Sequence, residues 1–184
     1  MRICGIPVRL HDPFLLRREV AMESKAKLLG HPIHQILIVF PLGLLGMAVI
    51  FDVLRVAAGW ALGTTVFHMI AAGVVAGLVA AVFGLVDWSA IPGSTRAKGV
   101  GARHGLGNVV VVVLFLASWW LRRADPANPP STAFVLSLLG GGLALVTGWL
   151  GGELVNRLGV GVDDGAHLDA PSSLSGRPAR SSER

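Results

Sequence analysis

The chain has 184 residues, of which 53% are hydrophobic and only 15% are charged. Together with a mean hydropathy of +0.65, this composition excludes an ordinary soluble domain of this size and indicates a membrane protein. The formal net charge of +5 would suit a nucleic-acid partner, but no basic stripe interleaved with aromatic residues is present, so we expect none. The single cysteine, Cys4, excludes a disulfide framework or a cysteine-based metal cluster within one chain.

Basic residues mark the N-terminal segment, residues 1–30, which contains six lysines and arginines. The segment has no sustained apolar run, so it is not typical of a cleavable signal peptide. We predict that it forms a basic cytoplasmic arm. Met22 opens a compact lead-in to the first apolar run, and we regard it as an alternative start of translation.

The first apolar run predicts a membrane helix over residues 35–57. It opens directly after His31 and His34, so two histidines lie where water gives way to hydrocarbon. Pro41 lies inside this helix and has no N–H group, so the carbonyl of Leu37 loses its usual donor. We therefore expect a bend there, or another neighbour for that carbonyl.

Three further apolar runs follow, each long enough to cross a hydrocarbon core of about 30 Å at about 1.5 Å per residue. They predict helices over residues 61–86, 102–121 and 133–155. The predicted fold is an all-α integral membrane four-helix bundle over residues 31–162. The polar, Ser-, Pro- and Arg-rich tail, residues 163–184, is predicted to be disordered.

Lysines and arginines are distributed unevenly between the two ends of the predicted bundle. The arm, the loop after the second helix and the C-terminal segment hold most of them, whereas the other end has only Arg55, Arg122 and Arg123. The positive-inside rule therefore places the N and C termini in the cytoplasm. We expect a multi-pass protein of the bacterial inner (plasma) membrane, surrounded by the lipid bilayer.

Small residues recur at four-residue intervals in the second and fourth predicted helices. They are Gly73, Gly77, Ala81, Gly140, Ala144, Gly148 and Gly152. Such ladders let another helix backbone approach closely. We expect them to serve packing above all, and they also offer a surface for membrane redox or oligomeric partners.

Ionisable side chains are costly inside a membrane, so those near the spans are functional candidates. Turn positions place one polar layer at the cytoplasmic end, comprising His31, His34, Asp87, Arg103, His104, Asn108 and Glu153. In the plain structural alternative, Asp87 pairs with Arg103 and His31 only solvates the helix start. Glu153 and Arg157, at i and i+4, would then form an ion pair at the interface.

A second pair of polar residues is predicted nearer the outer side. Asp52 and His68 lie at similar distances before and after the turn of the first hairpin, near Trp60. Neighbouring antiparallel helices would bring them to one depth. The pair would either fix the helix register through a hydrogen bond or handle protons.

His34 and His104 support a sharper hypothesis. Histidines from two helices at one depth can hold a b-type haem, with Asn108 or Asp87 fixing the imidazole tautomer. The other possibilities are a proton or ion path through both polar layers, or a purely structural bundle that acts as a partner subunit. The sequence favours the polar path or the structural bundle and leaves haem as the alternative, and it singles out no catalytic residue.

Several short motifs occur together between His31 and Val162. They are His31-Pro32-Ile33-His34-Gln35, Phe51-Asp52, Gly84-Leu85-Val86-Asp87-Trp88, Arg103-His104 with Asn108, and Gly151-Gly152-Glu153. In combination they resemble the bacterial membrane family known as domain of unknown function 2231. Gln35 departs from that family's usual His-Pro-x-His-Pro opening, whereas His34 is retained.

The resemblance implies a four-helix inner-membrane domain, and it implies no particular activity. Some members of the family are joined to a Rieske-like iron–sulfur domain, which favours a role in electron transfer. The present sequence contains no such extension.

Overall fold

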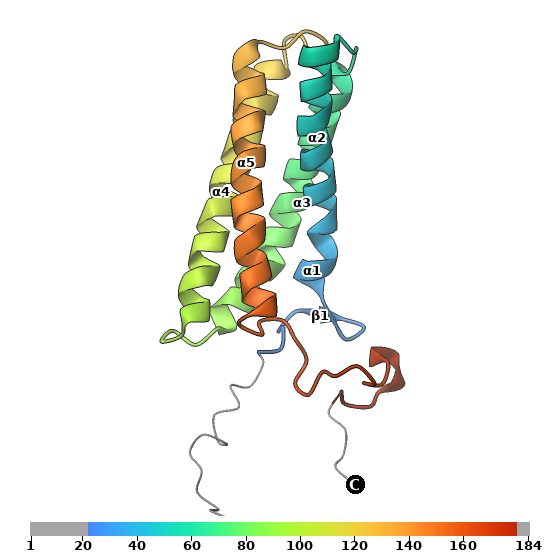
Figure 1. Ribbon diagram of the computed structural model, residues 1–184, viewed down its shortest axis with the longest axis vertical. Helices are drawn as coiled ribbons and strands as arrows, with labels where there is room; N and C mark the ends of the chain where they lie inside the picture. The colour runs from blue at the N-terminus through green and yellow to red at the C-terminus, as the bar shows by residue number, and fades with distance from the viewer. Residues whose placement is uncertain (1–21, 180–184) are drawn as a thin grey trace, which may run out of the picture.

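The computed structural model describes residues 22–179, and Figure 1 shows a long bundle of helices running side by side. Within the described residues the helices are α1 (Ile33–Leu37), α2 (Val39–Ala58), α3 (Gly63–Ala90), α4 (Arg96–Arg122) and α5 (Ser131–Asn156). With α1 and α2 taken as one span, four helices are long and apolar enough to cross a membrane. The predicted all-α four-helix bundle is confirmed, whereas the cytoplasmic location of both termini stays a prediction.

The helices extend beyond the apolar runs from which they were predicted. The largest difference is at α4, which begins at Arg96 although its apolar run starts about residue 102. The hydroxyl oxygen of Thr95 accepts a hydrogen bond from the backbone N–H of Lys98 at 3.2 Å, which caps the helix start. A polar first turn is thus helical, and it projects from the part of the bundle that is apolar enough for lipid.

The first span is interrupted between Leu37 and Val39, as the missing donor of Pro41 predicts. Ile38 links α1 to α2 with a nearly helical backbone. Its N–H donates to His34 O at 3.0 Å, and its carbonyl accepts from the N–H of Leu42 at 3.1 Å. The hydrogen bonding continues across the break, so α1, which carries His34, and α2 together form one span, Ile33–Ala58.

An apolar cluster fills the middle of the bundle. Its buried members are Leu45, Ala48, Val66, Ile70, Val74, Val111 and Phe115. The outer surface is apolar too, because large side chains such as Leu42, Val82 and Leu145 are exposed. An apolar exterior around an apolar core is what a bilayer requires of a spanning bundle.

A small structure that we call the terminal cap closes one end of the bundle; it comprises residues 22–32 and 159–175 (Figure 1). Strands β1 (Lys27–Leu28) and β2 (His31–Pro32) form an antiparallel hairpin. The turn uses positive φ angles at Leu29 and Gly30, 51° and 86°, which suit a two-residue hairpin loop.

The two ends of the described chain meet in the terminal cap. Met22 forms a parallel bridge with Val160, and a short helix, η1 (Ser173–Ser175), follows farther along the chain. Met22 of the predicted arm therefore contacts the segment that follows α5, and Asp163 of the predicted tail pairs with Lys27 of the arm. Residues 1–21 lie outside the described residues. The structure therefore does not test the alternative start of translation at Met22.

Candidate functional site

His34 and His104, predicted to share one depth, lie next to each other in the bundle. His34 comes from α1 and His104 from α4, and both side chains are partly buried. Their ring centroids are 6.4 Å apart and the ring planes are nearly perpendicular, at 88°. This contact joins the first helical hairpin to the second.

Each imidazole is anchored through one nitrogen to a backbone carbonyl of a neighbouring helix. Nδ1 of His34 lies 2.9 Å from the carbonyl oxygen of Ala80 on α3, and Nδ1 of His104 lies 2.8 Å from that of Thr147 on α5. Because a carbonyl oxygen only accepts, Nδ1 must carry the proton in both rings. In the neutral form, the lone pair of each ring is therefore on Nε2, the nitrogen that remains able to bind a metal.

Glycines make room for both rings. A Cβ at Gly84 of α3 would lie 2.9 Å from the His34 ring, and one at Gly151 of α5 would lie 3.2 Å from the His104 ring. Each glycine lies one helical turn after the residue whose carbonyl accepts from that ring. The rings thus dock in the same way on α3 and α5, at glycines that lie outside the predicted ladders.

Asn108 supports His104 but not His34. The Asn108 side-chain amide donates to the carbonyl oxygen of His104 at 2.9 Å and lies 3.2 Å from Nε2 of the same ring. The Thr147 hydroxyl donates to Asn108 Oδ1 at 3.1 Å. His104 is therefore held from both ring nitrogens, and Asn108 is itself held in place.

The other members of the predicted inner layer do not join this pair. The Asp87 carboxylate accepts from the Ser24 hydroxyl at 2.8 Å and from the backbone N–H of Lys25 at 2.7 Å, in place of the expected Arg103. Asp87 therefore ties the terminal cap to α3. Arg103 is exposed, and Nε2 of the exposed His31 lies 3.3 Å from the Ser173 hydroxyl within the cap.

Glu153 pairs across the bundle instead of along its own helix. Its carboxylate lies 2.6 Å from a guanidinium nitrogen of Arg96 at the start of α4, in place of the expected Arg157, which is exposed. Arg96 is well exposed, so this is an ordinary surface ion pair that closes the same end of the bundle.

The outer polar layer is centred on Asp52, whose partner is Arg122 and not His68. The guanidinium of Arg122 donates to both carboxylate oxygens, at 3.0 and 2.5 Å, and neither side chain has exposed surface. The Ser137 hydroxyl donates to the same carboxylate at 2.7 Å. His68 is exposed and packs edge-on against Phe67, with ring centroids 5.3 Å apart.

Helix rotation explains why His68 is not the partner. Val66 and Ile70, two residues before and after it on α3, are fully buried. Positions two apart on a helix lie on nearly opposite sides, so His68 faces outward although its depth matches that of Asp52. Depth alone does not decide which side chains meet.

Arg122 is the functional-site residue that the sequence interpretation missed. The sequence pattern groups it with Arg55 and Arg123 as basic residues of the outer end, whereas its side chain is fully buried. Its Nε donates to the Ser118 hydroxyl at 3.2 Å, and that hydroxyl donates to the carbonyl of Ala133 at 2.6 Å. One signal was available, because Arg122 follows His104 by the same 18 residues that separate Asp52 from His34.

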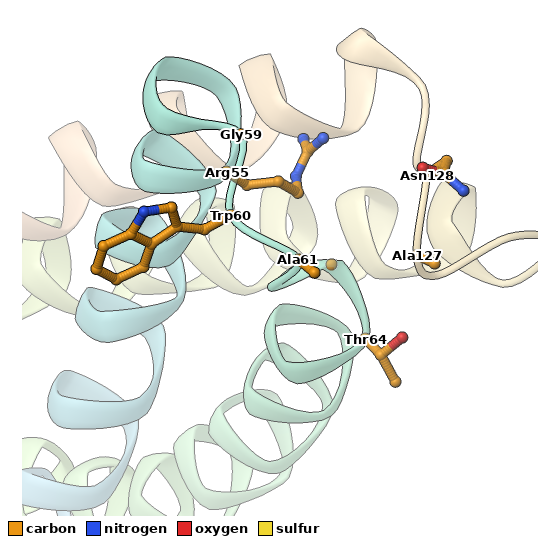
Figure 2. A pocket seen from close by; sticks show the side chains of 8 residues that line it. Arg55, Gly59, Trp60, Ala61, Thr64, Ala127 and Asn128 are labelled. Carbon is orange, nitrogen blue, oxygen red and sulfur yellow. The ribbon is translucent and has the colours of Figure 1, made fainter.

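A cavity of about 340 Å³ lies beside this layer, between the α2–α3 turn and the connection from α4 to α5. Figure 2 shows the Arg55 side chain at this cavity, with Thr64 and Asn128 also on its lining. Nε of Arg55 donates to Asp52 at 3.3 Å. Two guanidinium groups therefore share the one carboxylate of Asp52.

The two polar layers are separated by the apolar cluster. The 18 residues from His34 to Asp52 correspond to roughly 27 Å along a helix. Between these layers lie buried side chains such as Leu45, Val111 and Phe115. Within the described residues, the His34–His104 pair and the Asp52–Arg122 pair are thus two separate sites.

A metal site in this bundle would depend on few protein donors. Among residues 22–179 there is no group of three or more His, Cys, Asp or Glu side chains placed to hold one metal ion. The two Nε2 atoms of His34 and His104 are the donors that the geometry offers.

Comparisons with known proteins agree with a membrane bundle. The model of one family, described as "Predicted membrane protein (DUF2231)", matches residues 30–164 of the chain. No curated protein and no solved structure matches the chain.

Proposed function

The chain belongs to the DUF2231 family of predicted membrane proteins, and we propose that it is an electron-transfer module in which His34 and His104 hold one b-type haem. The observation that carries this proposal is the pair of imidazoles from two hairpins. Their centroids are 6.4 Å apart, and each ring is fixed through Nδ1. Histidine ligands of metals are typically oriented in this way by an acceptor at the second nitrogen.

The number of donors favours haem over a bare metal ion. Structural zinc sites use four protein ligands and catalytic ones three, whereas this part of the chain offers two. A haem supplies its equatorial nitrogens itself and takes axial ligands such as histidine from the protein.

The residues of the chain would prepare and orient the ligands. The carbonyls of Ala80 and Thr147 hold the Nδ1 protons and leave Nε2 as the donor in both rings. Haem binding would require the Asn108 amide to leave Nε2 of His104, and its bond to the His104 carbonyl at 2.9 Å would then hold it in place. When bound, the haem supplies one-electron redox chemistry.

A path for protons or ions through both layers is supported less well. The Asp52 layer is internally satisfied by Arg122, Arg55 and Ser137. Apolar side chains fill the space between this layer and the histidines. A conducting path would need polar groups or water in that space.

We place the histidine pair near the cytoplasmic side of the bacterial inner membrane, with both termini in the cytoplasm. The Lys25, Lys27, Arg96 and Lys98 side chains lie at the histidine end. The opposite end has three basic residues, Arg55, Arg122 and Arg123, so the positive-inside rule favours a cytoplasmic histidine end. Reporter fusions after residue 128 should therefore be active outside, and those after residues 93 and 177 inside. The reverse pattern would refute this orientation.

An absorption spectrum of the full chain tests the haem proposal. Protein purified from haem-supplied cells should show a Soret band that shifts on reduction. His34→Ala and His104→Ala should each abolish or strongly alter the band while helicity is retained. His68→Ala is the matched control, because this histidine is exposed and its ring packs edge-on against Phe67, away from the pair. A helical protein that stays colourless under these conditions would overturn the proposal.

A further inference from the structure

We infer that the chain is a tandem repeat of one two-helix unit, and that the inner face of each unit is built to dock on the inner face of the other unit about a pseudo-two-fold axis. Unit 1 comprises α1 to α3 and unit 2 comprises α4 and α5. In both units an ascending helix is followed by a descending one in Figure 1. This inference does not depend on the haem proposal.

The first helices of the units correspond at a constant offset of 70 residues. His34 corresponds to His104 at this offset, and both rings bond a carbonyl of the following helix. The buried positions correspond as well. They are Leu45 with Phe115, Ala48 with Ser118, and Asp52 with Arg122.

The second helices correspond at a constant offset of 67 residues. The two glycines that receive the histidine rings, Gly84 and Gly151, are related by this offset. So are buried positions along both helices. They are Val66 with Ala133, Ile70 with Ser137, and Gly73 with Gly140.

The contacts between side chains inside each unit repeat, in addition to the positions of the buried residues. A Cβ at Gly73 would lie 2.6 Å from the Leu45 side chain, and one at Gly140 would lie 2.9 Å from the Phe115 ring. Leu45 and Phe115 are equivalent, and so are the two glycines. In each unit a large side chain and a histidine, 11 residues apart, dock on two glycines that are also 11 residues apart.

The contacts between the units identify the axis that relates them. In a two-fold arrangement, a residue meets its own equivalent only on the axis. His34 meets its equivalent His104, and Asp52 meets its equivalent Arg122. These two contacts lie near opposite ends of the bundle, so the pseudo-two-fold axis runs along its length.

The opposite charges of Asp52 and Arg122 decide which units pair. Two copies of unit 1 would bury two carboxylates on the axis, and two copies of unit 2 would bury two guanidinium groups. Either arrangement leaves like charges buried and unpaired. The partner of each inner face is therefore the other unit, selected against self-pairing by repulsion.

The two hydroxyl groups that support the ion pair belong to unit 2, and their equivalents in unit 1 are apolar. Ser118 and Ser137 bond the pair, whereas Ala48 and Ile70 occupy the equivalent positions. If the repeat is real, the whole layer can be exchanged between the units. The hydroxyl introduced by Ala48→Ser would then face the carbonyl of Val66, as the Ser118 hydroxyl faces that of Ala133.

The test compares two exchanges in the full chain, both in an Arg55→Gln background so that no arginine at position 52 meets Arg55. The charge exchange is D52R with R122D. The layer exchange adds A48S, I70S, S118A and S137I. We expect the layer exchange to melt within about 4 °C of the background, and the charge exchange alone to melt lower. If the likeness is coincidental, the added hydroxyls lack partners and the layer exchange melts lowest, which would overturn the inference.

A second comparison avoids buried charge, in case neither exchange folds. Exchanging the equivalent residues, L45F with F115L, should retain a cooperative thermal transition because each of the two side chains packs on a glycine, Gly73 or Gly140. Exchanging residues that are not equivalent, L154F with F115L, makes the same two chemical changes at buried positions and should lose more degrees. Equal losses in the two variants would contradict the repeat.

Discussion

Asp52 and Arg122 form a two-point ion pair in which neither side chain has any exposed surface. The pair joins α2 to α4, two helices from different hairpins. The pair is compatible with a stable fold only when both side chains are present, because either charge alone in an apolar interior would be left unpaired.

Replacing Arg122 by methionine should therefore destabilise the bundle by about 3–5 kcal/mol, because the carboxylate of Asp52 is left buried. The double variant D52L with R122M removes both charges and should recover most of this loss. Unfolding monitored by circular dichroism in mixed micelles measures both. A single variant that loses less than about 1 kcal/mol would show that Arg55 and Ser137 satisfy the carboxylate alone.

A second prediction concerns Gly84, the glycine against which the His34 ring packs. Gly84→Ala would place a methyl group 2.9 Å from ring atoms of His34, so the ring must move and its bond to Ala80 must weaken. We expect a loss of about 1–3 kcal/mol from overpacking, together with a change in the imidazole ¹⁵N resonances. Gly148→Ala is the control, because nothing lies within 4 Å of that position. Equal stability of both variants would contradict the docking of the ring on Gly84.

The sequence predicts some features of this site and not others, because apolar length, depth along a helix and helix rotation are separate properties. Apolar length located the spans, and depth along them was enough to bring His34 and His104 together. Depth does not fix the rotation of a helix, so it paired Asp52 with His68 in place of Arg122. The terminal cap has no hydrophobic period, so nothing in the sequence pattern indicated that Asp87 would bond residues near Ser24.

The repeat was hidden for a related reason. Equivalent positions of the two units differ in chemistry, with Asp52 opposite Arg122 and Ile70 opposite Ser137. A comparison of residue types therefore finds little likeness. The likeness lies in burial and in the glycine contacts, which only coordinates reveal.

A third prediction concerns Asp87, because its carboxylate holds the terminal cap on α3. Asp87→Asn removes the charge from hydrogen bonds to the Ser24 hydroxyl and the Lys25 amide, and bonds to a charged group contribute about 1.5–3 kcal/mol each. Hydrogen exchange in residues 22–33 should rise at least tenfold. Asp169→Asn is the control, since Asp169 is an exposed residue of the tail. Unchanged exchange in the Asp87 variant would show that the cap is held by other contacts.

The fourth prediction concerns the charges that close the terminal cap. The Lys27 ammonium lies 2.5 Å from the carboxylate of Asp163 and 2.8 Å from that of Glu23. The hydrogen bond from Lys27, and then that from the Asp164 backbone, lowers the pKa of Glu23 below its ordinary 4.5. Hydrogen bonds to Asp163 and then to Glu23 raise the pKa of Lys27 above its ordinary 10.5.

These shifts set the pH window in which the cap stays closed. A carboxyl whose pKa is lowered on folding stabilises the fold above its ordinary pKa, and this contribution disappears as the pH falls through the folded value. The raised pKa of Lys27 acts in the opposite sense, so its contribution is complete below 10.5 and disappears as the pH rises through the folded value. Spin labels at the exposed Leu28 and Leu168, with Cys4 replaced by serine, should give a narrow distance distribution at neutral pH and a broad one well below pH 4.5. The Lys27→Gln variant should give a broad distance distribution at every pH. If the distance distribution of the protein with Lys27 does not change with acid, these charges do not hold the cap.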